Sequence, residues 1–249
     1  MLVGQASTGH DGLMLVLGHR GASTVAPENT PAAFRIADEM GADGIELDVR
    51  RVPDGRLLIA HDPLPDVLEE IDRLGCATLE EALDACGDRM LVNIEIKNSP
   101  TDAGFDPTMA MVAPVIEALR RRGTAARPRW LISSFSWETL DACREFDPGI
   151  ATAYLCERIN TMWIERTALA GHSAVHPREP VVNEELVAEC HAAGVAVNTW
   201  TCNDGTRIAE LAAMGADGVC TDVPDVALGA LGRVGADVTP SWRMWPPSR

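Results

Sequence analysis

Charged side chains occur inside two segments that otherwise have the pattern of buried β-strands. Glu46 and Asp48 lie in GIELDVR (44–50), and Glu95 and Lys97 lie in LVNIEIK (91–97). Because side chains two positions apart in a strand point to the same face, each pair is expected to face one space. Three carboxylates that converge there repel one another and are costly to bury unless a cation lies among them.

A hard divalent cation is the simplest partner for this all-oxygen cluster. Glu46, Asp48 and Glu95 therefore predict a site for Mg²⁺ or Ca²⁺, because zinc sites usually recruit His or Cys. The alternative is an ion-pair network in which Lys97 and Arg20 neutralise the acidic side chains without a metal.

Two histidines stand at the ends of extended segments. His19 ends LMLVLGH (13–19), directly before Arg20, and His61 ends LLIAH (57–61). A pair of imidazoles can supply a general base and a general acid near neutral pH. The other four histidines have ordinary explanations in loops, at a strand end or on a helix face: His10, His172, His176 and His191.

Short apolar segments alternate with longer segments of helical periodicity almost from end to end. The predicted strands are 13–19, 44–50, 91–97, 130–135, 150–155, 173–177, 195–201 and 217–222. This alternation favours a single (β/α)8 barrel as one domain, in which the carboxyl ends of the strands meet at one mouth. An open doubly wound sheet is the alternative, but no G-x-G-x-x-G motif follows the first strand.

Local signals define the first helix and the limits of the barrel. Thr30 suits the N-cap, Pro31 the first helical position and Gly41 the C-terminal cap. The segment 62–77 fits neither a strand nor a full crossover and is expected to be a loop or small cap. The barrel core is expected over about 13–234, followed by an irregular tail rich in Pro and Trp (235–249).

Composition excludes several classes of protein. The net charge of -16, from 37 acidic and 21 basic residues, argues against nucleic acid as a partner. The seven cysteines include no C-x-x-C pair, so reduced thiols are expected. With neither a signal peptide nor an apolar run long enough to span a bilayer, we expect a cytoplasmic protein. Two roles are open for the tail, packing on the outside of the barrel and homo-oligomer formation.

A set of motifs, in order along the chain, resembles the glycerophosphodiester phosphodiesterase family. They are HRGASTVAPENT (19–30), ELDV (46–49), HD (61–62), EIK (95–97), WTCND (200–204) and TDVP (221–224). The spacing of HRG and PENT is the most specific part, whereas WTCND and TDVP alone are weak. The resemblance covers about residues 15–228 and implies a (β/α)8 barrel.

The resemblance also implies roles for individual residues. His19 and His61 match the family's acid and base, and Glu46, Asp48 and Glu95 match its metal ligands. The positions expected near the substrate are Arg20 and Lys97, which match groups near the phosphate, and Trp200, which either packs beside the glycerol or fills the top of the barrel. Glu28 and Asn29 in PENT either support the site or cap the following helix.

The implied reaction is hydrolysis of a deacylated phospholipid, such as glycerophosphocholine or glycerophosphoethanolamine, to glycerol 3-phosphate and an alcohol. Family members commonly carry a longer insertion after the HD motif. Because loops at the mouth select the substrate, the shorter cap leaves the identity of the preferred head group, and the preference for glycerol, undetermined. Two other functions fit parts of the pattern. One is a related barrel that cleaves phospholipids to a cyclic phosphate, and the other is a catalytically idle barrel that binds phosphodiesters.

Overall fold

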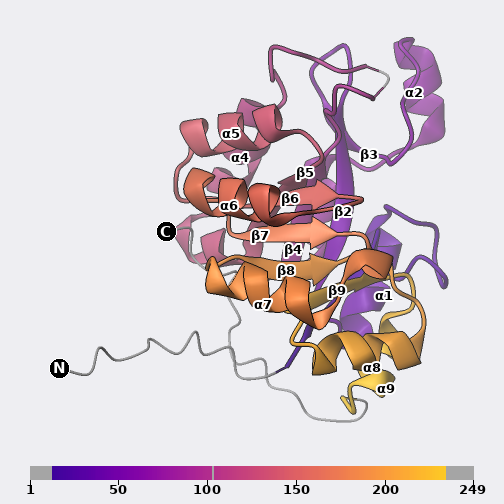
Figure 1. Cartoon of the computed structure of the whole chain (residues 1–249). Helices are drawn as coiled ribbons and strands as arrows, with labels where there is room; N and C mark the ends of the chain where they lie inside the picture. The colour runs from indigo at the N-terminus through magenta and orange to yellow at the C-terminus, as the bar shows by residue number, and fades with distance from the viewer. Residues whose placement is uncertain (1–12, 103, 234–249) are drawn as a thin grey trace.

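The computed structural model describes residues 13–102 and 104–233, which form a closed parallel β-barrel surrounded by helices (Figure 1). Strand β1 pairs in parallel with both β2 and β9, which closes the ring. All eight predicted strands are confirmed: β1 (Leu15–His19), β2 (Gly44–Arg51), β4 (Leu91–Ile96), β5 (Trp130–Ser134), β6 (Ala151–Cys156), β7 (Ala174–Pro177), β8 (Ala196–Thr199) and β9 (Gly218–Thr221). The predicted tail, 235–249, lies outside the described residues.

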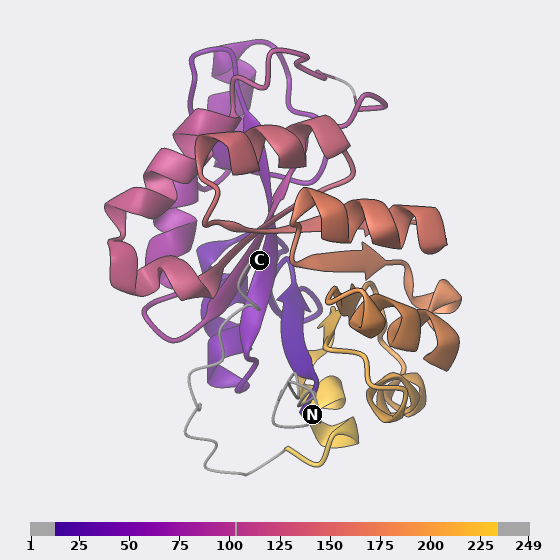
Figure 2. The same cartoon turned by 60° about the vertical axis from the view of Figure 1, so that its left-hand side comes forward.

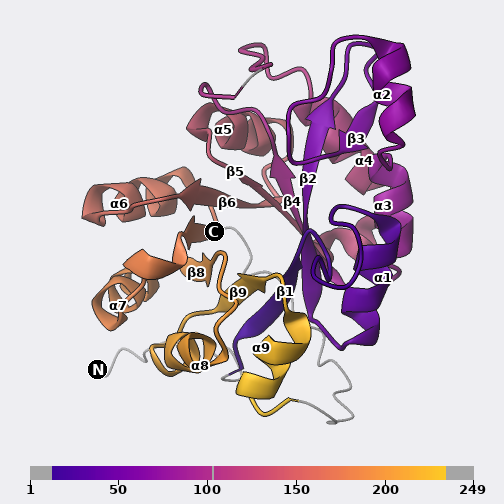
Figure 3. The ribbon, with the colours of Figure 1, turned by 90° about the vertical axis from the view of Figure 1, so that its right-hand side faces the viewer.

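The helices lie outside the barrel, as the views in Figures 2 and 3 show. They are α1 (Pro31–Glu39), α2 (Leu68–Leu74), α3 (Leu79–Ala85), α4 (Val112–Arg121), α5 (Trp137–Phe146), α6 (Thr161–Ala170), α7 (Glu184–Ala192), α8 (Gly205–Ala213) and α9 (Pro224–Ala230). In α1, Thr30 accepts a hydrogen bond from Ala33, Pro31 opens the helix and Gly41 has a positive φ just after it, as predicted. No helix in the described part is both long and apolar enough to cross a membrane.

Apolar side chains form separate layers inside and outside the barrel. A cluster composed of strand residues alone fills the barrel interior at the amino ends of the strands: Leu15, Leu17, Leu91, Leu131, Ala153, Ala174 and Ala196. Outward-facing residues such as Leu47 and Ile94 instead pack with helix residues such as Phe34 and Leu83. This strand-only cluster closes the barrel at the amino ends of the strands. The polar residues nearer the carboxyl ends of the strands therefore face the mouth.

The expected cap after the HD motif is a short structure beside the mouth. Strand β3 (Leu57–Ile59) pairs antiparallel with the end of β2, and helix α2 follows it, at the upper right of Figure 1. Ile71 of α2 packs against Val52 and Leu58. The cap is therefore a seven-residue helix fixed by a small apolar cluster. The seven cysteines, all of them described, form no disulfide.

Candidate active site

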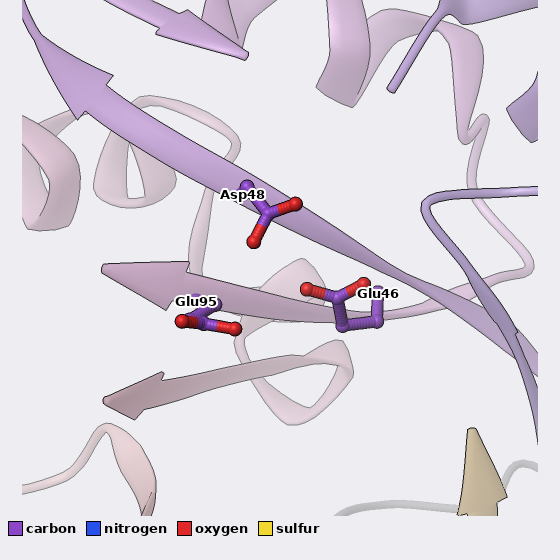
Figure 4. Close-up of side chains that lie close together, drawn as sticks. All are labelled: Glu46, Asp48 and Glu95. Atoms are coloured by element: carbon purple, nitrogen blue, oxygen red, sulfur yellow. The ribbon is translucent and has the colours of Figure 1, made fainter. Parts of the chain in front are cut away.

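Glu46, Asp48 and Glu95 converge at the mouth from two neighbouring strands (Figure 4). Strands β2 and β4 are parallel and place Asp48 opposite Glu95. One carboxylate oxygen from each of the three residues lies within 4.8 Å of the others, and all three side chains are buried. The alternation read from the sequence therefore brings the three predicted ligands together.

Two cations neutralise this cluster only in part. Lys97 Nζ lies 3.0 Å from Asp48 Oδ1 and 2.8 Å from Glu95 Oε1, and Arg20 Nε lies 3.3 Å from Asp48 Oδ2. Glu46 accepts a hydrogen bond from the backbone N–H of Arg20, but its buried Oε1 has no hydrogen-bond partner among the described residues. An ion-pair network thus explains Asp48 and Glu95 and leaves Glu46 without a cation. This donor set fits a divalent ion.

Burial and mutual repulsion shift the pKa values of the three carboxyl groups in a way that a bound cation would reverse for two of them. Burial, followed by the charges of Asp48 and Glu95, raises the pKa of Glu46 well above its ordinary value. Burial and the charge of Asp48 raise the pKa of Glu95 to about 7. Burial alone would raise the pKa of Asp48 as well, yet Lys97, Asn29 and Arg20 outweigh it and hold that pKa low. A bound cation would relieve this repulsion.

The loop after β1 carries the HRG and PENT motifs to the carboxylates. Arg20 has φ 57° and Gly21 has φ 85°. A Cβ at Gly21 would lie 2.6 Å from the backbone carbon of Ala33, so the turn requires glycine. From this turn the Arg20 side chain reaches Asp48 of the acidic cluster through Nε, and its Nη1 donates to Glu28 Oε1, outside the cluster, at 2.8 Å.

Asn29 and Glu28 lie beside the cluster and do not cap helix α1. Asn29 Nδ2 donates to Asp48 Oδ2 at 2.8 Å, and the backbone N–H of Asp48 donates to Asn29 Oδ1 at 3.3 Å. The capping hydrogen bond of α1 comes from Thr30 instead. Asn29 therefore contacts a member of the acidic cluster, and a role of the PENT motif in supporting the site stays a prediction.

The two histidines occupy the same mouth with carboxylate partners of different exposure. His19 Nδ1 lies 2.6 Å from Asp222 Oδ1, and 28% of the Asp222 side chain is exposed. His61 Nδ1 lies 2.8 Å from Asp62 Oδ1, in a side chain that is 90% exposed. Arg50 donates two hydrogen bonds to the backbone carbonyl of His61, at 3.0 and 2.6 Å, and so fixes the segment after β3.

A pocket of about 180 Å³ joins these groups. The residues that line it include the polar His19, Arg20, Glu46, His61, Asn93, Glu95 and Lys97 and the apolar Leu17, Phe135, Leu155 and Trp200. The rings of Trp200 and Phe135 pack edge to face with their centroids 5.5 Å apart, and Trp200 Nε1 donates to the backbone carbonyl of His176 at 2.7 Å. Trp200 is thus held at the pocket wall.

His176, which has an ordinary explanation at a strand end, lies within β7 beside the pocket. Its side chain points into the barrel, lines the pocket and lies 3.0 Å from Asn198 Nδ2. Burial lowers the pKa of His176 to about 3, so its imidazole is neutral at physiological pH. The position within β7 was visible in the sequence, but the direction of the side chain depends on how that strand joins the ring.

The sequence did not identify Arg50, which contacts His61, Asp222, which contacts His19, or Asn203, which contacts Asp222. Asn203 and Asp222 fall in the WTCND and TDVP segments, which are weak as motifs. A stronger signal was present in the chain: MGADGIELDV (40–49) and MGADGVCTDV (214–223) are an internal repeat, in which Asp222 occupies the position of Asp48.

A parallel barrel with an acidic cluster and two histidines at its mouth offers ligands for a divalent ion beside groups for proton transfer, an arrangement that suits metal-assisted hydrolysis. The sequence matches the glycerophosphoryl diester phosphodiesterase family over residues 19–226, and the chain belongs to this family. It is 32% identical to a glycerophosphodiester phosphodiesterase of Caldanaerobacter subterraneus subsp. tengcongensis, over 86% of this chain and 96% of that protein.

Solved structures show the same fold. A phosphodiesterase of Oleispira antarctica in complex with the product sn-glycerol-3-phosphate superposes with a TM-score of 0.79 and 26% identity, covering 89% of this chain and 98% of that one. A glycerophosphodiester phosphodiesterase of Thermotoga maritima superposes with a TM-score of 0.70 and 28% identity, covering 87% and 97%. The predicted barrel and family are confirmed.

Proposed function

We propose that this protein hydrolyses glycerophosphodiesters to glycerol 3-phosphate and an alcohol. The observation that carries the proposal is the convergence of the acidic cluster and two carboxylate-partnered histidines on one pocket. The product-bound Oleispira antarctica structure and the Caldanaerobacter enzyme support the substrate class. Glycerophosphocholine and glycerophosphoethanolamine are the first substrates to test.

The proposed roles follow from the chemistry of a phosphodiester. Glu46, Asp48 and Glu95 would hold one divalent cation, Mg²⁺ or Ca²⁺, which when bound supplies a Lewis acid beside the phosphoryl oxygens. Arg20 and Lys97 supply positive charge for the phosphate, with the Arg20 guanidinium suited to two oxygens at once.

Proton transfer falls to His19 and His61. As an oxygen nucleophile forms a new P–O bond, one histidine accepts its proton. As the P–O bond to the alcohol breaks, the other histidine gives a proton to the departing oxygen. The nucleophile is either water or a hydroxyl of the substrate's own glycerol, and water completes hydrolysis in both cases. Trp200 and Phe135 form an apolar wall against the carbon skeleton of the substrate.

A panel of esters tests the activity. Glycerophosphocholine, glycerophosphoethanolamine and bis(p-nitrophenyl) phosphate are each assayed with Mg²⁺, with Ca²⁺ and with chelator. Release of glycerol 3-phosphate is measured for the two glycerol esters, and release of p-nitrophenol for the third ester. Metal-dependent turnover of the glycerol esters supports the proposal. Turnover of the nitrophenyl ester alone indicates a broader phosphodiesterase, and accumulation of a cyclic phosphate indicates the related phospholipase reaction. No turnover of any ester favours the phosphodiester-binding barrel.

The remaining expectations for this protein stay predictions. These are the cytoplasmic location, the homo-oligomer, the absence of a nucleic-acid partner and the assignment of residues 1–249 to a single catalytic domain. Sedimentation at several protein concentrations tests the oligomeric state directly.

A further inference from the structure

The first and last strands of the barrel bring together two residues that lie 203 positions apart. Strands β1 and β9 are neighbours, with Gly18 opposite Thr221. His19 is the next residue of one strand, and Asp222 directly follows the other. Their side chains meet with His19 Nδ1 2.6 Å from Asp222 Oδ1. Barrel closure, which makes these strands adjacent, therefore creates the pair.

The hydrogen bonds around Asp222 fix which atoms donate. Asn203 Oδ1 accepts from the backbone N–H of Asp222 at 2.8 Å and from Thr221 Oγ1 at 3.0 Å. The Asn203 amide is therefore oriented, and its Nδ2 donates to Asp222 Oδ2 at 2.6 Å. Ser23 Oγ donates to Asp222 Oδ1 at 3.1 Å. Both carboxylate oxygens of Asp222 act as acceptors.

An ionised carboxylate accepts hydrogen bonds and cannot donate them. The hydrogen bond from His19, followed by those from Asn203 and Ser23, lowers the pKa of Asp222 to about 2. His19 must then carry a proton on Nδ1 in order to donate to Asp222, which leaves Nε2 as the unprotonated nitrogen of the neutral ring. Because His19 lines the pocket, Nε2 is the nitrogen available for proton transfer.

The two copies of the internal repeat also correspond in their contacts. Asp43 Oδ2 accepts from the backbone N–H of Val16 at 2.8 Å, and its repeat counterpart Asp217 accepts from Val197 in the same way at 2.7 Å. The two repeats therefore make the same contact with the preceding strand of the ring. Continued along the strand, this correspondence makes Asp222 the counterpart of Asp48.

The repeats diverge in the residue two positions before that aspartate. In β2 it is Glu46, so Asp48 is part of a carboxylate cluster, whereas in β9 it is Cys220. Asp222 instead faces His19, Asn203 and Ser23. The same repeat thus places one carboxylate, Asp48, in the acidic cluster and a second carboxylate, Asp222, beside a histidine.

We propose that Asp222 is the positioning residue of His19, which it holds with the proton on Nδ1 and with Nε2 directed to the substrate. This inference rests on the proposed function for the role of His19. Asn203 is the residue that orients Asp222. The partner of His61, Asp62, is almost fully exposed, so its carboxylate restrains that ring far less.

A mutant cycle tests whether Asp222 acts through His19. Asp222→Asn replaces one carboxylate oxygen with an amide, and we expect kcat to fall by about 10²-fold with little change in KM. In a His19→Ala background the same substitution is expected to cost less than about 2-fold, because the group that it positions is absent. An equal loss in both backgrounds would overturn the proposal.

The ring of His19 can also be observed without turnover. In ¹⁵N NMR spectra near pH 8, the wild-type protein is expected to show the Nδ1–H tautomer of His19, assigned by its loss in His19→Ala, and Asp222→Asn is expected to shift the population toward Nε2–H. An unchanged tautomer in a folded Asp222→Asn protein contradicts the proposal. If the wild-type protein cleaves no ester, the proposed function fails, and the tautomer still tests the pair.

Two further variants keep the test decisive. Asp54→Asn is the matched control, because the Asp54 side chain is 29% exposed, accepts hydrogen bonds from Arg56 and does not line the pocket. It is expected to leave kcat and the His19 tautomer unchanged. If Asp222→Asn does not fold, Asn203→Ala removes one donor to Asp222, and an intermediate loss of kcat is expected. Wild-type kcat and tautomer in Asn203→Ala would count against the network.

Discussion

Asn29 donates a hydrogen bond from Nδ2 to Asp48 Oδ2 at 2.8 Å and thereby ties the loop after β1 to the acidic cluster. Asn29 itself has φ 57°, in the left-handed region that asparagine tolerates better than most residues. One residue thus meets a backbone requirement and a side-chain requirement together, which explains an asparagine at this place in the PENT motif.

Asn29→Gly separates the two requirements, because glycine keeps the positive φ and loses the side chain. We expect the free energy of unfolding in chelator to fall by about 1 to 3 kcal/mol, since buried Asp48 loses a hydrogen-bond donor. Urea denaturation measures the change. Asn29→Asp, which adds a negative charge beside Asp48, is expected to destabilise more, and equal stability of the wild type and both variants would show that the hydrogen bond contributes nothing.

His19→Ala and His61→Ala each test acid and base catalysis. A positioned acid or base contributes about 10²-fold to 10⁴-fold, so kcat for glycerophosphocholine is expected to fall at least 10²-fold in each variant. His191→Ala is the control, because His191 pairs with Asp217 and does not line the pocket. Wild-type rates in either of the first two variants would remove that histidine from the mechanism.

Arg20→Ala tests recognition of the phosphate. Loss of a guanidinium that contacts an anionic transition state is expected to lower kcat/KM by about 10-fold to 100-fold. Arg20→Lys is expected to recover only part of the loss, because an ammonium cannot contact two oxygens with one planar group. The exposed Arg35 of α1 supplies the control, Arg35→Ala. An unchanged kcat/KM in Arg20→Ala would assign Arg20 to the support of Asp48.

Metal binding is expected to stabilise the fold. A cation at about 100 times its dissociation constant that binds only the folded state adds roughly 2.7 kcal/mol, so Tm rises with Mg²⁺ or Ca²⁺. Glu95→Gln is expected to reduce this rise, and in chelator to be at least as stable as the wild type, since one of three repelling charges is gone. The ion-pair network would be favoured if the Tm of the wild type did not change with metal and the Tm of Glu95→Gln in chelator were markedly lower than that of the wild type.

The raised pKa of Glu95 predicts a pH dependence in chelator. Its pKa is about 7 in the folded protein and 4.5 without the fold, so between these values the folded state binds more protons. The contribution of Glu95 to stability is therefore full below about pH 4.5 and is lost as pH rises through 7. Thermal melts from pH 5 to 8 are expected to show a shallower decline for Glu95→Gln, and parallel curves would contradict the assignment.

The sequence alone determined the features that depend on local periodicity. Alternation placed Glu46 and Asp48 on one face and Leu47 on the other, because successive side chains of a strand must point in opposite directions. Thr30 and Pro31 specified the start of α1 through the local geometry of a helix terminus. The strands, the barrel class and the residues that converge at its mouth followed from such patterns.

Tertiary structure decided what depends on register and closure of the ring. The pairing of His19 with Asp222 exists because β1 and β9 are adjacent, and no local pattern states that adjacency. The inward direction of His176 and the unpaired buried oxygen of Glu46 likewise depend on neighbouring strands. Burial and strand pairing arise from contacts between residues that are distant in the chain. They determine the partners and the pKa values of side chains, whereas the sequence gives only the side-chain types.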